Sequence, residues 1–302
     1  MFKKVMVPLD GSILAEHALN PALALVQSEH STLLLLRVPV FKELAVASLP
    51  GYDWLPPTDE VMARPRQEAR SYLQDFTYAR PYEDLALQTM VVDGDVASVI
   101  VDTARQQGVD LIVMTTHGRS GLTRWTLGSV TERVLQQAPC PVLATRPNHS
   151  ITRVLFPLDG SRLAEASLAP GLAIARLMGA EATLLHVLAP EGLSLPGLNR
   201  LADPDAAPSR RAVRQDPEAY LADVAARFGG TDQAFKRVVR EGPAGQRILD
   251  YAADHHIDLV AMATHGYTGV RRWLYGSTTE KVMRGSDKGM LIVRPFAASD
   301  DT

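Results

Sequence analysis

The sequence repeats itself once, and this repeat limits the folds open to the chain more than any other feature. The segment KKVMVPLDGSILAE from Lys3 matches TRVLFPLDGSRLAE from Thr152, an offset of 149 residues. Further along, THGRSGLTRWTLGS (116–129) matches THGYTGVRRWLYGS (264–277) at an offset of 148. This period is too long for a solenoid, whose repeats span about 20–50 residues. The sequence therefore predicts two copies of one domain, which we place at residues 1–147 and 151–297.

Each half alternates apolar runs rich in β-branched residues with segments of helical period. In the first half the pattern predicts strands over residues 3–8, 32–38, 85–92, 110–115 and 141–146, and helices over 13–27, 59–79, 96–107 and 129–137. This alternation predicts an α/β fold with an open, mostly parallel five-stranded sheet and helices on both faces in each half. Only a short connector, residues 146–151, separates the halves, so we expect an intrachain domain pair.

Composition and charge exclude several classes of protein. The 31 basic and 34 acidic residues give a formal charge of −3, so no overall positive field attracts nucleic acid or an anionic membrane. The single cysteine, Cys140, excludes an intrachain disulfide, and no spaced set of metal ligands accompanies it. No apolar stretch approaches the 18 residues of a membrane span, and Asp10 interrupts the N-terminal apolar run before a signal peptide could form. We expect a cytoplasmic protein without a nucleic-acid or membrane partner or a protein-only metal site.

The repeated glycine loop has the residue types of a phosphate cradle. Gly118 lets the backbone approach a ligand closely, and Gly128 frees the turn that enters the next helix. The start of that helix presents unpaired N–H groups and a partial positive charge, which suit a phosphate. Ser129 adds a hydroxyl donor and Arg119 adds a cation. The second half repeats the loop with Gly266, Gly276 and Ser277.

A purely structural interpretation of the same loop stays open at this point. The sequences SVTE and STTE, which begin at Ser129 and Ser277, have the spacing of capping boxes. In a capping box the serine and the glutamate satisfy the first N–H groups of their own helix, which contributes about 1 kcal/mol. Spacing alone does not separate a capped helix start from an anion site.

A second repeated motif follows the first strand of each half. It is an Asp-Gly-Ser turn, at Asp10 and at Asp159. In an open parallel sheet, ligands bind beyond the carboxyl ends of the strands, where the strand order reverses. The loops after the first and fourth strands flank this crevice, so we expect each aspartate to lie near its glycine loop. A plain strand-to-helix turn is the alternative.

The combination of VPLDGS with THGRSGLTRWTLGSVTERVLQQAPCPVLATRP, present twice, closely resembles the universal stress protein family in its tandem two-domain form, over nearly the whole chain. The nucleotide-binding pattern of that family is glycine, two residues, glycine, nine residues, glycine, and then serine or threonine. Both halves match from the second glycine onward. The first glycine is replaced by Thr115 in one half and by Ala263 in the other, which leaves the backbone less free to approach a ligand there.

This resemblance implies a fold and a ligand. The fold would be Rossmann-like, as in the adenine-nucleotide alpha hydrolases, with the last strands of the two halves paired across an internal pseudo-two-fold axis. Some members of the family bind ATP and others do not. The resemblance also implies a position for each site residue: Asp10 and Asp159 at the ribose or adenine end, the backbone near Val38 and Val187 beside the base, and Ser129 and Ser277, with the following N–H groups of Val130 and Thr278, at the phosphates.

We interpret the chain as a stress-response regulatory protein that binds ATP or a related adenine nucleotide, with or without magnesium, in at least one half. An unknown protein partner and further homodimerisation complete this interpretation. One alternative is a nucleotide-free protein–protein interaction module, which Thr115 and Ala263 favour. The other is a slow ATPase, against which stands the absence of a cradle lysine for a γ-phosphate. Catalysis is not the favoured interpretation.

Overall fold

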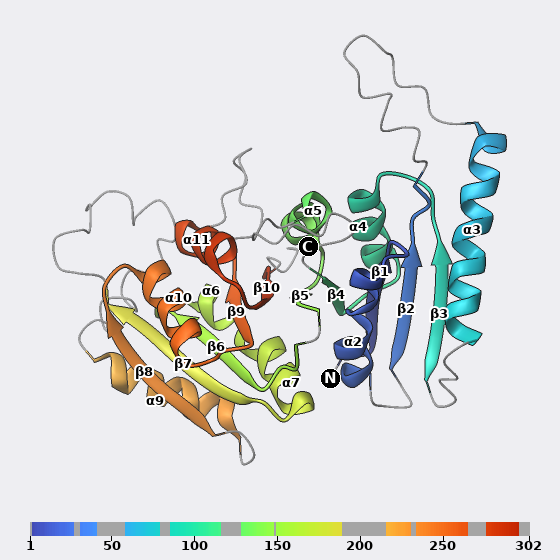
Figure 1. Cartoon of the computed structure of the whole chain (residues 1–302). Coiled ribbons are helices and arrows are strands. Elements are labelled where there is room, and N and C mark those ends of the chain that lie inside the picture. The colour runs from blue at the N-terminus through green and yellow to red at the C-terminus, as the bar shows by residue number, and fades with distance from the viewer. Residues whose placement is uncertain are drawn as a thin grey trace, which may run out of the picture.

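The computed structural model describes residues 2–26, 31–40, 58–78, 85–115, 128–147, 149–188, 216–230, 234–264 and 276–295 (Figure 1). The first half contains β1 (Lys4–Leu9), α1 (Ile13–Glu16), α2 (Leu19–Leu25), β2 (Thr32–Arg37), α3 (Asp59–Tyr78), β3 (Ala86–Val91), α4 (Val96–Gln106), β4 (Leu111–Thr115), α5 (Ser129–Gln137) and β5 (Val142–Thr145). The second contains β6 (Arg153–Leu158), α6 (Arg162–Glu165), α7 (Leu168–Met178), β7 (Glu181–Leu188), α9 (Pro217–Gly229), β8 (Phe235–Glu241), α10 (Ala244–Asp254), β9 (Leu259–Ala263), α11 (Ser277–Gly285) and β10 (Gly289–Val293).

All ten of these strands form one continuous sheet in the order β3-β2-β1-β4-β5-β10-β9-β6-β7-β8. Within each half every pairing is parallel, whereas β5 and β10 pair antiparallel, with Leu143 opposite Leu291. In Figure 1 the blue-to-green elements of the first half and the yellow-to-red elements of the second lie on either side of this seam. The predicted α/β fold and the pairing of the last strands are confirmed.

Both faces of the sheet are buried under helices, as expected of parallel strands. Successive residues of β2 point to opposite faces of the sheet. Leu33 and Leu35 belong to the hydrophobic cluster beneath α2 and α3, while Leu34 and Leu36 belong to the cluster beneath α4 and α5. All four are fully buried. This explains why β2 consists of consecutive leucines rather than alternating apolar and polar residues.

The first helix of each half is shorter than predicted. We expected one helix over residues 13–27, but α1 ends at Glu16 and α2 begins at Leu19. The reason is Pro21, which lacks an N–H group and whose ring clashes with the carbonyl four residues earlier. Pro170 stands at the same place in α7, and the second half has the same break. The single predicted helix is therefore two helices in each half, divided just before the proline.

The two halves fill the same core position with different side chains. In the second half Phe156 lies against Gly171, where an added Cβ atom would come within 2.4 Å of the Phe156 ring and 3.2 Å of the Ala261 Cβ. In the first half the corresponding residues are Val7, Ala22 and Val113. The larger phenylalanine is thus balanced by two smaller neighbours, as close packing requires.

Candidate functional site

The strand order reverses between β1 and β4 in the first half, and between β6 and β9 in the second. The pairs are parallel, with Met6 opposite Ile112 and Leu155 opposite Val260. Neighbouring strands lie about 4.8 Å apart, so the loops that leave these strands start side by side at one edge. The structure therefore brings the residue after β1, Asp10, and the end of β4 to the same edge of the sheet.

The turn after β1 is held together by its own side chains. The Asp10 carboxylate accepts hydrogen bonds from the backbone N–H of Ser12 at 2.9 Å and from its hydroxyl at 2.5 Å. The Ser12 oxygen in turn accepts from the N–H of Ala15 and caps α1. Gly11 adopts a φ of +75°, which glycine tolerates best. These bonds fix the orientation of the aspartate and the start of α1 together.

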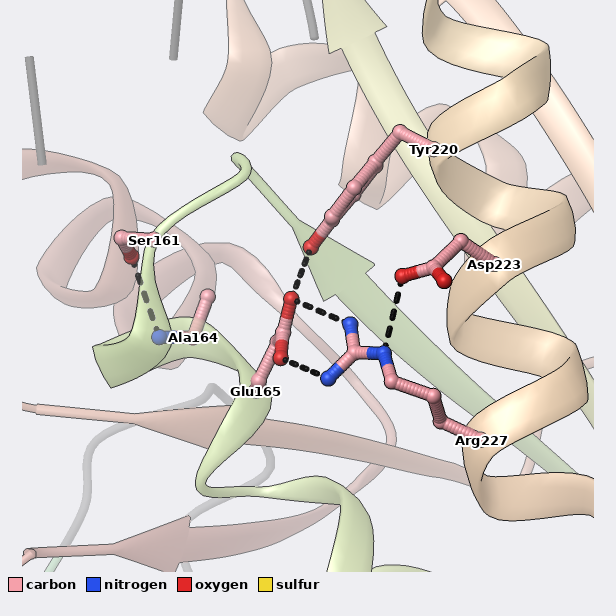
Figure 2. Close-up of polar contacts among 6 residues, drawn as sticks. All are labelled: Ser161, Ala164, Glu165, Tyr220, Asp223 and Arg227. Carbon is pink, nitrogen blue, oxygen red and sulfur yellow. Dashed lines mark hydrogen bonds and ion pairs between the residues drawn. The ribbon is translucent and has the colours of Figure 1, made fainter. Parts of the chain in front are cut away.

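The second half repeats this turn almost atom for atom. The Asp159 carboxylate accepts from the N–H of Ser161 at 3.0 Å and from its hydroxyl at 2.5 Å. Ser161 caps α6 through the N–H of Ala164 (Figure 2). Gly160 has a φ of +84°. Asp159 is exposed at the surface.

The start of α5 differs from the capping box that its sequence suggests. The N-cap residue is Gly128, not Ser129, and the cap makes no side-chain hydrogen bond. Ser129 is therefore the first residue inside the helix, exposed at the surface, and Val130 follows it half-buried. The first backbone hydrogen bond of the helix runs from the N–H of Glu132 to the carbonyl of Gly128 at 2.9 Å. The capping-box interpretation is wrong for this helix.

The start of α11 has the same construction. Gly276 is the N-cap residue without a side-chain cap, and Ser277 is the first helical residue. Ser277 is exposed and Thr278 is half-buried. A Cβ atom added at Gly276 would meet no atom of the described residues within 4 Å. Among the described residues, nothing stands against the Cα of this helix start, and a phosphate needs such access to the first N–H groups.

The replaced first glycine of the pattern affects the two halves differently. Thr115, at the end of β4, is 6% exposed, and its carbonyl accepts a hydrogen bond from the Thr131 hydroxyl at 3.3 Å. This bond ties the first turn of α5 to the end of β4. Ala263, at the end of β9, is half-buried. The smaller residue therefore stands in the second half, at the more accessible position.

The two predicted base-contact residues lie next to their aspartates. Leu9 pairs with Arg37 in β1 and β2, so Val38 follows beside Asp10 at the same edge. Val38 is buried in the cluster beneath α4 and α5, and its counterpart Val187 packs against the same cluster. Three other predicted site residues, Gly118, Arg119 and Gly266, lie outside the described residues.

Sequence reasoning missed a set of contacts behind the aspartate turn. Arg37 donates from Nη1 to the carbonyl of Leu9 at 3.1 Å, and its guanidinium lies 5.2 Å from the centre of the Tyr72 ring. The Tyr72 hydroxyl donates to Glu16 at 2.8 Å. Burial and this carboxylate raise the pKa of Tyr72. The contacts join α1 and α3 to the carboxyl end of β1.

The corresponding contacts in the second half use a histidine and an added ion pair. His186 bonds the carbonyl of Leu158 through Nδ1 at 2.8 Å. Figure 2 shows Tyr220 donating to Glu165, whose carboxylate also pairs with both terminal nitrogens of Arg227 at 3.0 and 3.1 Å. Glu16 and Glu165 both end the repeated LAE triplet of the sequence. That repetition was the available signal, although it does not identify the tyrosine partner.

An ion pair in the first half holds α5 against α4. Arg133 of α5 donates from its two terminal nitrogens to the Asp95 carboxylate at 2.6 and 2.9 Å, and Asp95 caps α4 through the N–H of Ser98. The hydrogen bonds from Arg133 lower the pKa of Asp95 to about 2, against the opposing effect of burial. In the second half the Lys281 stem packs on Gly245 instead.

The described part of the chain was also searched for metal ligands, a reactive thiol and a membrane-spanning helix. No group of three histidine, cysteine or acidic side chains there could hold a metal ion. Burial raises the pKa of the Cys140 thiol to about 12, so this cysteine is protonated and packed in the core. None of the described helices is long and apolar enough to cross a membrane.

Known proteins resemble the chain in sequence and in fold. The sequence profile of the universal stress protein family matches residues 1–146 and again 150–294. Universal stress protein YxiE of Bacillus subtilis is 32% identical over 148 residues, which are 48% of this chain and all of that protein. A universal stress protein of Methanocaldococcus jannaschii is 33% identical over 150 residues, 48% of this chain and 83% of its own length. The crystal structure of a universal stress protein from Archaeoglobus fulgidus superposes on this chain with a TM-score of 0.72 and 19% sequence identity. The superposition includes 97% of this chain and 98% of the Archaeoglobus chain, and it supports the fold.

Proposed function

The chain belongs to the universal stress protein family, and on that premise we propose that it is a cytoplasmic stress-response regulator that binds ATP or a related adenine nucleotide in at least one half. Gly128, Ser129 and Val130, or Gly276, Ser277 and Thr278, hold the phosphates. Asp10 or Asp159 holds the ribose or adenine end, beside Val38 or Val187. The nucleotide acts as a regulatory ligand that changes the choice of protein partner.

One observation carries the proposal. At both helix starts the N-cap residue is a glycine without a side-chain cap among the described residues, so the serine of the Ser-x-x-Glu sequence begins the helix and does not cap it. Anions bind at such helix starts because the N–H groups point outward and the helix dipole is positive there. An aspartate with a fixed orientation stands at the same edge of the sheet in each half.

Calorimetry with ATP and magnesium tests the proposal on the wild type, Gly128→Ala and Gly276→Ala. At Gly276 the added Cβ meets no atom of the described residues, so the variant should fold normally and lose affinity because the methyl group displaces the phosphate from the helix N–H groups. Loss of one hydrogen bond to a charged group costs about 1.5–3 kcal/mol, which weakens binding roughly 10- to 150-fold. Equal binding by the wild type and both variants would contradict the assignment of the phosphate site.

The alternatives give different results in the same samples. No heat of binding for any adenine nucleotide in the wild type would leave the nucleotide-free interaction module ahead. Phosphate release above a protein-free control, lost in the Asp10→Ala and Asp159→Ala double variant, would indicate the slow ATPase. GTP serves as the control ligand for recognition of the base.

A further inference from the structure

The residue that follows the Asp-Gly-Ser turn differs between the two halves. In the first half it is Ile13, which is 75% exposed although it is apolar. In the second half it is Arg162, the first residue of α6, which is also exposed. Both turns otherwise continue into the same Leu-Ala-Glu triplet. One position of a repeated motif therefore presents an apolar side chain in one half and a cation in the other.

Arg162 lies at the edge of the sheet where we place the nucleotide. It comes three residues after Asp159, at the carboxyl end of β6. Helix α6 packs against β6 and also against β9, the strand from which the second glycine loop starts. That loop leads to Ser277 at the start of α11. The start of α6 thus lies next to Asp159 and near β9, which both border the proposed site.

The Arg162 guanidinium is not engaged by the protein within the described part of the chain. No hydrogen bond or ion pair there involves this side chain. The acid of the same helix, Glu165, is already paired with both terminal nitrogens of Arg227. The Asp159 carboxylate accepts from the N–H and the hydroxyl of Ser161. An exposed arginine in this situation can turn toward an anionic ligand without breaking a contact of its own.

The first half also has an arginine near its aspartate turn, but this one is held by the protein. Arg37 donates to the carbonyl of Leu9 and lies against the Tyr72 ring. His186 takes this place in the second half, where it is 4% exposed. Each turn therefore has one aspartate and one arginine, and their formal charges are equal. The halves differ in whether the arginine binds protein groups behind the turn or stands exposed at the surface. The glycine loops add no difference in charge, because each carries two arginines, Arg119 and Arg124 in the first and Arg271 and Arg272 in the second.

The exposed arginine bears on the number of phosphates that the site can hold. The start of α11 offers unpaired N–H groups and a partial positive charge, which suit one phosphate group. Each further phosphate of a nucleotide adds negative charge and acceptor oxygens, and arginine binds such groups with a planar set of donors. Arg162 can supply this second point of contact, whereas Ile13 offers neither charge nor a hydrogen-bond donor.

We propose that Arg162 is a specificity-determining residue, which makes the second half favour adenosine diphosphate and triphosphate over the monophosphate. The first half, with Ile13 at the same position, lacks this preference. The proposal rests on the proposed function, because it concerns the same sites. It goes beyond that function by assigning different ligand preferences to the two halves.

Calorimetry with ATP and with AMP, both in the presence of magnesium, tests the proposal in proteins with one intact site. Gly128→Ala leaves the second site and Gly276→Ala leaves the first. In the Gly128→Ala protein, Arg162→Ile should weaken ATP binding about three- to fivefold and leave AMP binding nearly unchanged. This factor corresponds to about 0.7–1 kcal/mol, the upper range for an ion pair at the surface. Arg162→Lys keeps the charge and should retain most of the ATP affinity.

A reciprocal substitution and a matched control separate this effect from a general change in charge. In the Gly276→Ala protein, Ile13→Arg should strengthen ATP binding by about the same factor. Arg153→Ile removes an exposed arginine from the opposite end of β6, so it should leave both affinities unchanged. Added KCl should reduce the effect of Arg162→Ile, because salt screens exposed charges. Thermal melting of each variant checks that the fold is intact.

The outcomes for this proposal and for the proposed function are distinct. ATP binding with the same preference over AMP in both halves, unaffected by Arg162→Ile, would overturn the specificity role alone. Binding confined to the first half would overturn that role as well. Failure of the wild type to bind either nucleotide would instead contradict the proposed function, and the specificity role with it.

Discussion

Replacement of Gly171 by alanine should destabilise the second half severely. The new Cβ would lie 2.4 Å from Cε1 of Phe156, a separation that real Cβ atoms do not show, and both residues are in the core. Phe156 is fully buried, so its ring cannot rotate away without displacing other side chains. Overpacking of this kind costs about 1–3 kcal/mol, and the severity of the overlap places the expected loss at about 2–3 kcal/mol. The melting temperature should fall by roughly 4–10 °C.

The side chains at the corresponding positions of the first half show which substitutions should compensate for Gly171→Ala. Phe156→Val alone should cost about 2–4 kcal/mol because it leaves a cavity. The triple variant Phe156→Val, Gly171→Ala and Ala261→Val copies Val7, Ala22 and Val113 of the first half, so it should recover most of the stability lost by either single change. Urea unfolding of the single, double and triple variants measures the coupling. An equal cost of Gly171→Ala in the wild type and in the Phe156→Val background would refute the reasoning.

Three further predictions concern the ion pair, the thiol and the repeated tyrosine. Asp95→Ala should cost about 1 kcal/mol, because the helix cap is lost and the half-exposed ion pair with Arg133 adds little, while Asp95→Asn keeps the cap and should cost less. The pKa of Asp95 in the folded protein is lowered to about 2, below the unfolded value of about 3.9. The ionised carboxylate therefore stabilises the folded state above pH about 3.9, and this stabilisation is lost as the pH falls toward 2. The wild type and Asp95→Asn should accordingly have the same stability near pH 2. Cys140, whose pKa burial raises to about 12, should resist a thiol reagent at pH 8 in the folded protein and react after unfolding in urea. Tyr220→Phe should cost about 1 kcal/mol in urea unfolding by removing the hydrogen bond to Glu165, and an unchanged midpoint would show that this bond contributes nothing.

The sequence predicted the sheet well because its strands are unusually clear. Consecutive leucines in β2 and their flanking turn residues define a buried strand without reference to the rest of the chain. The break after Glu16 also has a local cause in Pro21, and it could have been predicted from that proline. Local rules therefore suffice for most of the secondary structure.

The candidate site was predictable only in part. The spacing of the repeat identified Asp10 and the start of α5, but a serine three residues before a glutamate does not reveal whether that serine precedes the helix or begins it. Gly128 took the N-cap position instead, and this changes what the first N–H groups can bind. The contact between Arg37 and Tyr72 joins residues far apart in sequence through the packing of α3, which no local pattern encodes.

The antiparallel seam between β5 and β10 has a consequence for assembly. Each of these strands would be an edge strand in an isolated half, with its backbone groups free to pair with another chain. Because one polypeptide carries both strands, the seam closes as a unimolecular step, and its formation is independent of protein concentration. Dilution should therefore leave the paired sheet intact, whereas either half expressed alone should associate with a second copy of itself in a concentration-dependent manner.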